Sequence, residues 1–173
     1  VDFFQSFFFK ILGVNWFAYT FHSSIFNFVI SALSYHFFLS FKVSKTKSLI
    51  YTLSFATLAY TISGTPFVDH HATFFLLIAT YLIIQVLNFP KRNYLWVLVV
   101  MLFFLGFLSK QAPTIYIILS QGIILLYFFI KTKKIDSIKL IFFSLIFFTI
   151  LFLLFLIYLK IDFKLFFTQY LDY

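Results

Sequence analysis

The chain has 173 residues, of which 63% are hydrophobic and only 10% are charged. A water-soluble domain of this length cannot bury so much apolar surface, so the composition excludes a soluble globular protein and predicts a chain that lies in lipid. The net charge of +8 does not indicate nucleic-acid binding, because the cations fall in short clusters between apolar runs, as in membrane proteins.

Six apolar runs predict an all-α fold, a polytopic transmembrane bundle of about six helices. The runs cover residues 15–41, 48–63, 71–89, 94–109, 113–130 and 138–160. The second and fourth runs are short for a bilayer core of about 30 Å, so we expect interfacial Lys, Tyr and Trp to complete them, or one pair to be re-entrant. Residues 1–173 are expected to form one transmembrane domain, an internal piece of a larger membrane protein.

The first run carries small polar side chains at intervals of four, three, four and three residues, which places them on one helical face. They are Thr20, Ser24, Asn27, Ser31 and Ser34. In lipid such a face predicts a contact with another helix, because it allows close approach and hydrogen bonding. A substrate groove is the alternative. His22 and His36 lie off this face.

The positive charges predict an orientation. The breaks on one side of the membrane carry nine cations, Lys42, Lys45, Lys47, Lys91, Arg92, Lys131, Lys133, Lys134 and Lys139, and the other side carries Lys10, Lys110, Lys160 and Lys164. Cytoplasmic loops are enriched in Lys and Arg. We therefore expect residues 69–71 and 110–113 to face the periplasm of a bacterial inner membrane.

A polar break before the third run contains Asp69, His70 and His71. Ionisable groups at the edge of a bilayer indicate a candidate functional site. Asp69 is the predicted catalytic residue and a candidate ligand of a divalent metal ion, and His70 and His71 are predicted to bind substrate. A metal site needs three or four ligands, so another loop would have to contribute. The structural alternative is that Asp69 caps the helix.

A second polar break lies between the fourth and fifth runs and contains Lys110 and Gln111. Lys110 either extends from the helix end to the membrane surface or binds a lipid-linked phosphate, for which an ammonium group is a suitable point charge. Gln111 is predicted to add a hydrogen bond to the same substrate. Pro113 suits the first turn of the fifth helix.

The two breaks resemble segments of a known family. Residues 65–75, with Asp69 before a helix, are similar to the second external loop of GT-C glycosyltransferases of the protein-mannosyltransferase and aminoarabinose-transferase-like group. Residues 106–113 are similar to their Gly-x-x-(Thr/Ser)-Lys-x-x-Pro segment, two spans further on. Residues 9–16 look like the start of the family's second helix.

The resemblance implies transfer of a hexose or pentose from a polyprenyl-phosphate carrier to an acceptor lipid, glycan or protein on the outer face. It implies that Lys110 holds the phosphate and that Asp69 organises the acceptor, a water or a metal ion. The family's main acidic residue lies in the first external loop, which this alignment places before Val1. We therefore expect this piece alone to be inactive.

Three other classes stay open. A transporter is also polytopic, but the Gly and Pro residues here lie mainly at helix ends and not in mid-membrane. A polysaccharide polymerase or ligase uses similar lipid-linked substrates, and its large external loop would lie beyond Tyr173. A non-catalytic membrane subunit is compatible with the structural alternative for every polar feature.

Overall fold

The computed structural model describes residues 3–59, 68–164 and 168, and this part of the chain is helical without any strand. Its helices are α1 (Phe3–Leu12), α2 (Trp16–Ser40), α3 (Lys45–Leu58), α4 (Val68–Asn88), the short 3₁₀ helix η1 (Pro90–Arg92), α5 (Leu95–Ser109), α6 (Gln111–Thr132) and α7 (Ile135–Tyr158). The all-α prediction is confirmed, and each of the six apolar runs corresponds to one helix.

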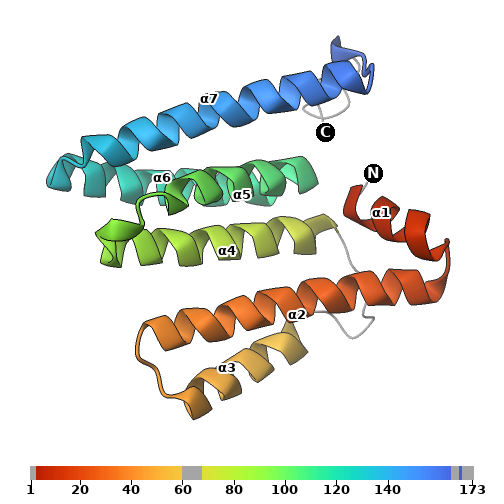
Figure 1. Ribbon diagram of the computed structural model, residues 1–173, viewed down its shortest axis with the longest axis horizontal. Coiled ribbons are helices and arrows are strands. Elements are labelled where there is room, and N and C mark those ends of the chain that lie inside the picture. Colours follow the sequence, from red (N-terminus) through yellow and green to blue (C-terminus); the bar gives the residue numbers. More distant parts are fainter. Residues whose placement is uncertain (1–2, 60–67, 165–167, 169–173) are drawn as a thin grey trace.

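The long helices run alternately up and down, so that successive connections lie at opposite ends of the bundle (Figure 1). α4 and α5 pair most extensively and form the middle of the bundle. α2 packs on α4 from one side and carries α3, while α6 and α7 both pack on α5 from the other side. The short α1 packs against the start of α2.

Within the part of the chain that the structure describes, four helices are long and apolar enough to cross a membrane: α2, α4 from His70 onward, α6 and α7. α5 is apolar but shorter, and α3 has only 14 residues in the described part of the chain. About six spans are therefore not confirmed. The predicted second run extends through residues 60–63, which lie outside the described residues.

The helix ends follow local sequence signals. The side chain of Asn15 accepts a hydrogen bond from the backbone N–H of Ala18 at 2.7 Å and caps α2, and Gly13 takes φ = 79° in the turn before it. Residues 9–16 thus form the end of α1 and a turn, as well as the start of α2. Pro113 lies in the first turn of α6, as predicted.

Three lysines take the left-handed backbone conformation where long helices end. Lys42 follows α2 with φ = 60°, Lys133 follows α6 with φ = 51° and Lys160 follows α7 with φ = 53°. Glycine is the usual residue at such positions. The chain has only four glycines, and at these turns it uses a cation instead.

The buried core is small and the outer helices are largely exposed. One core cluster joins α4, α5 and α6 and is built around Trp96, which is 1% exposed. On α6, by contrast, Ile123, Tyr127 and Ile130 are each 68–71% exposed. Apolar side chains exposed over whole helices are typical of lipid-facing surfaces, so the chain is consistent with an integral membrane protein.

The small polar face of α2 contacts neighbouring helices at two of its residues. The side-chain amide of Asn27 donates to the backbone oxygen of Ala56 on α3 at 2.9 Å, and Ser34 shares a 3.0 Å hydrogen bond with the hydroxyl of Tyr81 on α4. The predicted helix–helix contact is therefore confirmed there. Ser24 is exposed, and its hydroxyl bonds only within α2 among the described contacts.

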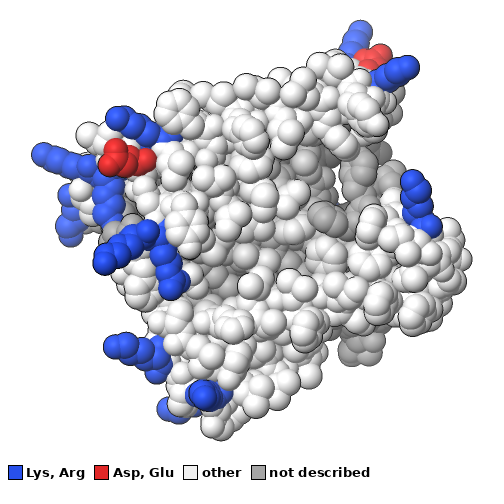
Figure 2. All heavy atoms as spheres, in the orientation of Figure 1, with Lys and Arg blue, Asp and Glu red and all other residues white. Residues whose placement is uncertain are grey.

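The positive charges gather at one end of the bundle (Figure 2). The connections α2–α3, α4–α5 and α6–α7 lie at this end (Figure 1), and all nine cations counted above lie on these connections or in the helix turns next to them. We call it the cation-rich end. The opposite end, where α2, α4 and α6 begin, is called the histidine end after the residues described next.

Candidate functional site

Two histidines meet inside the histidine end. His22 on α2 and His71 on α4 are both fully buried, and their ring centroids lie 4.8 Å apart with the planes tilted by 45°. Phe26 packs on both rings, at 5.0 and 4.5 Å, and Phe8 of α1 packs on His22 at 4.9 Å. Helices α2 and α4 therefore bring two imidazoles together, and phenylalanine rings pack against both of them.

His70 lies on a different side of α4 from His71. Its ring stacks toward Phe74 at 6.3 Å and is half-buried. Consecutive helical residues point about 100° apart, which accounts for this divergence. Of the two predicted histidines, the structure therefore brings only His71 into contact with a second imidazole.

Lys110 forms the junction between α5 and α6. Its backbone is extended (φ −156°, ψ 127°) and its side chain is half-buried. Its N–H donates to the oxygen of Gly106 at 2.9 Å, and its own carbonyl accepts from the hydroxyl of Thr114 at 2.7 Å. One residue thus ends one helix and begins the next, with its position fixed by hydrogen bonds on both sides. Gln111, the first residue of α6, is half-buried beside it.

Gly106 allows three helices to come close just below this junction. A β-carbon built at Gly106 would lie 3.4 Å from side-chain atoms of Leu76 on α4 and of Thr114 on α6. Gly106 and Thr114 are both buried, Thr114 completely. Gly106 belongs to the segment that resembles the glycosyltransferase family, and it has a packing role. A larger side chain there would push α4, which carries His70 and His71, away from α5 and α6, which meet at Lys110.

The close approach at Gly106 also determines how far the start of α4 and the α5–α6 junction extend toward the histidine end. At 1.5 Å per helical residue, Lys110 lies about 6 Å beyond Gly106 and His71 lies about 7.5 Å beyond Leu76, both toward the histidine end. The start of α4 and the α5–α6 junction therefore reach a similar level at this end. This agrees with the prediction that residues 69–71 and 110–113 lie on one side of the membrane.

Asp69 is only partly described. Its backbone lies in the first described turn of α4, which begins at Val68. The residues before Val68 are not described, so the capping alternative for Asp69 stays a prediction. The side chain of Asp69 and the preceding polar break at residues 60–67 lie outside the described residues. The predicted catalytic role of Asp69 therefore stays a prediction.

The described residues do not make a metal site. Within residues 3–59, 68–164 and 168, no group of three or more His, Cys, Asp or Glu side chains is close enough to hold an ion. The His22–His71 pair supplies at most two ligands, whereas a protein site uses three or four.

His22 was not predicted as a site residue from the sequence, where it is only a residue beside the small polar face of α2. The available signal was its position within a long apolar run, where an ionisable side chain by itself indicates function. Its partner was not predictable, because the contact with His71 depends on how α2 and α4 pack.

Comparison with known proteins adds no relative. No protein-family model matches this chain, and neither a curated protein nor a solved structure is significantly similar to it. The resemblance to GT-C glycosyltransferases therefore depends on the short segments around Asp69 and Lys110.

Proposed function

We propose that this chain is part of a membrane glycosyltransferase that moves a sugar from a polyprenyl-phosphate carrier to an acceptor on the outer face of a bacterial inner membrane. One observation supports the proposal above others. The α4 segment with Asp69, His70 and His71 and the α5–α6 junction with Lys110 reach a similar level at one end of the bundle, away from the cation-rich end.

The proposed roles follow from the chemistry of each group. Lys110 stabilises the negative charge that develops on the lipid phosphate as the sugar leaves, as a fixed cation in a low-dielectric site does effectively. Asp69 orients the acceptor hydroxyl and, as a carboxylate, can take its proton. His71 packs against His22 inside the bundle and so positions the start of α4, which carries Asp69 and His70.

Carrier binding tests the role of Lys110 without knowledge of the sugar. We predict that Lys110→Gln weakens binding of undecaprenyl phosphate by about tenfold or more, because one charge-assisted interaction is lost. Native mass spectrometry of the protein as its gene encodes it provides the measurement. Lys10→Gln is the matched control, since Lys10 is an exposed lysine at the same end. Equal binding by all three proteins would remove Lys110 from the site.

Turnover tests the role of Asp69. We predict that Asp69→Asn lowers sugar transfer at least about a hundredfold while membrane abundance stays unchanged, since the change keeps the side-chain size. Membranes are incubated with a panel of polyprenyl-phosphate-linked hexoses and pentoses, and labelled acceptor is counted. Carrier binding without transfer of any sugar from the panel would favour a polymerase, a ligase or a non-catalytic subunit.

A further inference from the structure

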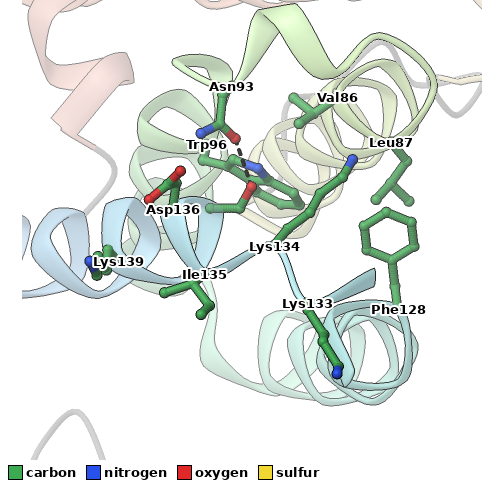
Figure 3. Close-up of a pocket in the computed structure, with 11 residues that line it drawn as sticks. Val86, Leu87, Asn93, Trp96, Phe128, Lys133, Lys134, Ile135, Asp136 and Lys139 are labelled. Carbon is green, nitrogen blue, oxygen red and sulfur yellow. Dashed lines mark hydrogen bonds between the residues drawn. The ribbon is translucent and has the colours of Figure 1, made fainter. Parts of the chain in front are cut away.

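A polar pocket of about 520 Å³ lies at the cation-rich end, between the α4–α5 and α6–α7 connections (Figure 3). Three lysines and one aspartate line it, namely Lys133, Lys134, Lys139 and Asp136. Inside the pocket the hydroxyl of Ser137 donates to the side-chain oxygen of Asn93 at 2.8 Å and joins the two connections. The pocket therefore has a fixed polar floor and an excess of positive charge.

Trp96 forms an inner wall of this pocket. The residue is 1% exposed, and its Nε1 makes no hydrogen bond to any group in the part of the chain that the structure describes. A buried indole N–H ordinarily has an acceptor. Figure 3 shows Lys134 reaching toward the side formed by Leu87 and Phe128, and its Nζ lies 5.1 Å from the ring centroid of Phe128. A ligand with phosphate oxygens would match the positive charge of the lysines that line this pocket.

An apolar groove of about 540 Å³ continues from the same tryptophan. It lies between α5, α6 and α7, and Trp96 lines both the pocket and the groove. Its lining residues on α6 extend from Ile118 to Ile130, about 18 Å along the helix axis. That length is close to one leaflet, which is half of a hydrocarbon core of about 30 Å.

Gly122 contributes to the shape of the groove. A β-carbon at this position would meet no atom within 4 Å, so the glycine leaves open space between the helices. Leu126, Ile130 and Phe142, which also line the groove, are 60–70% exposed. The groove is therefore accessible from the lipid phase and not closed inside the bundle.

We propose that the pocket and the groove together bind one anionic phospholipid of the leaflet at the cation-rich end. The phosphate headgroup lies among the three lysines, and one acyl chain lies in the groove. The polar pocket and the apolar groove meet at Trp96. A lipid likewise joins a polar headgroup to an apolar acyl chain. Basic pockets between transmembrane helices are known sites for such headgroups. This proposal is independent of the proposed sugar transfer at the opposite end.

The two tryptophans of the chain allow a direct test. Trp16 is 67% exposed, so Trp16→Phe leaves Trp96 as the single fluorescent indole without a loss of core packing. Phosphatidylglycerol and phosphatidylcholine with brominated acyl chains are then compared in reconstituted membranes, because bromine quenches an indole that it contacts. We expect quenching by both lipids, with a preference of at least about tenfold for phosphatidylglycerol, because the pocket carries an excess of positive charge.

Matched variants separate the pocket from general surface charge. Lys133→Gln, Lys134→Gln and Lys139→Gln together should abolish the preference for phosphatidylglycerol. Lys42→Gln, Lys45→Gln and Lys47→Gln remove the same charge at the same end, and each triplet includes one left-handed lysine; this control should keep the preference. Asp136→Asn, which removes the opposing charge, should strengthen it. Equal loss in both triplets would overturn the proposal.

The groove is tested separately with Gly122→Leu, which fills open space and should reduce quenching by either lipid. Unchanged quenching in this variant would overturn the acyl-chain assignment. Absence of quenching in the parent protein would mean that no acyl chain reaches Trp96, and would overturn the lipid proposal. Soluble glycerol phosphate should not displace the lipid; if it removes the preference completely, the pocket is a site for small anions.

Discussion

The two ends of the bundle place their polar groups differently. At the cation-rich end the charges lie on turns and near helix ends, around an open pocket, and the largest buried side chain is Trp96. At the histidine end the polar groups of His22, His71 and Thr114 are fully buried between helices. Charges on turns can determine orientation and attract lipid without contributing to the core, whereas buried imidazoles depend on the helices around them. The following substitutions test this difference.

The largest effect is expected from the tryptophans. Trp96→Ala removes the centre of the core cluster at the cation-rich end and should lower the free energy of unfolding by about 3–5 kcal/mol. Trp16→Ala, at an exposed position of the histidine end, should change it by less than about 0.5 kcal/mol. Unfolding in mixed detergent micelles, followed by circular dichroism, measures both. Similar losses in the two variants would show that burial at the two ends does not differ.

An intermediate effect is expected from the two glycines inside helices. Gly106→Leu places new atoms against Leu76 and Thr114 and should cost about 1–3 kcal/mol of stability through overpacking. Gly122→Leu meets open space and should be neutral or slightly stabilising, since leucine has the higher helix propensity. The same unfolding measurement distinguishes them. If Gly106→Leu is neutral, the close approach of α4, α5 and α6 at that point is not required.

The smallest effect is expected on the small polar face of α2. Asn27→Leu removes the hydrogen bond to the backbone of α3, and such interhelical bonds contribute about 0.6 kcal/mol on average in membranes. Ser24→Ala is the control, because Ser24 is exposed. A loss several times larger than this for Asn27→Leu would indicate that α3 depends on this single contact.

The sequence predicted the helices better than the membrane crossings. All six apolar runs became helices, because apolar composition between Gly, Pro and Lys signals specifies helical segments directly. The number of crossings was harder to predict, because α3 begins with Lys45 and Lys47 and α5 is confined between η1 and Lys110. Helix α1 was not predicted as a separate element, since ten residues are too few for a span.

The sequence predicted the candidate site as two short polar segments, but it did not predict contacts between side chains of different helices. The level shared by residues 69–71 and 110–113 follows from counting spans. The approach of His22 to His71 does not, because it depends on the packing of α2 against α4. The lipid pocket likewise combines Asn93 and Ser137, which come from different connections, and no sequence pattern joins them.

The left-handed lysines at the ends of α2, α6 and α7 have a consequence for how firmly these helices end. A non-glycine residue in this conformation costs roughly 1 kcal/mol, and a cation at a helix C-terminus recovers about 0.3–1 kcal/mol from the helix dipole. Neutralisation of such a lysine, by acetylation for example, leaves the backbone strain and removes the compensation. At Lys42 and Lys133, therefore, a charge that the sequence predicts to orient the chain in the membrane also keeps the last helical turn from fraying.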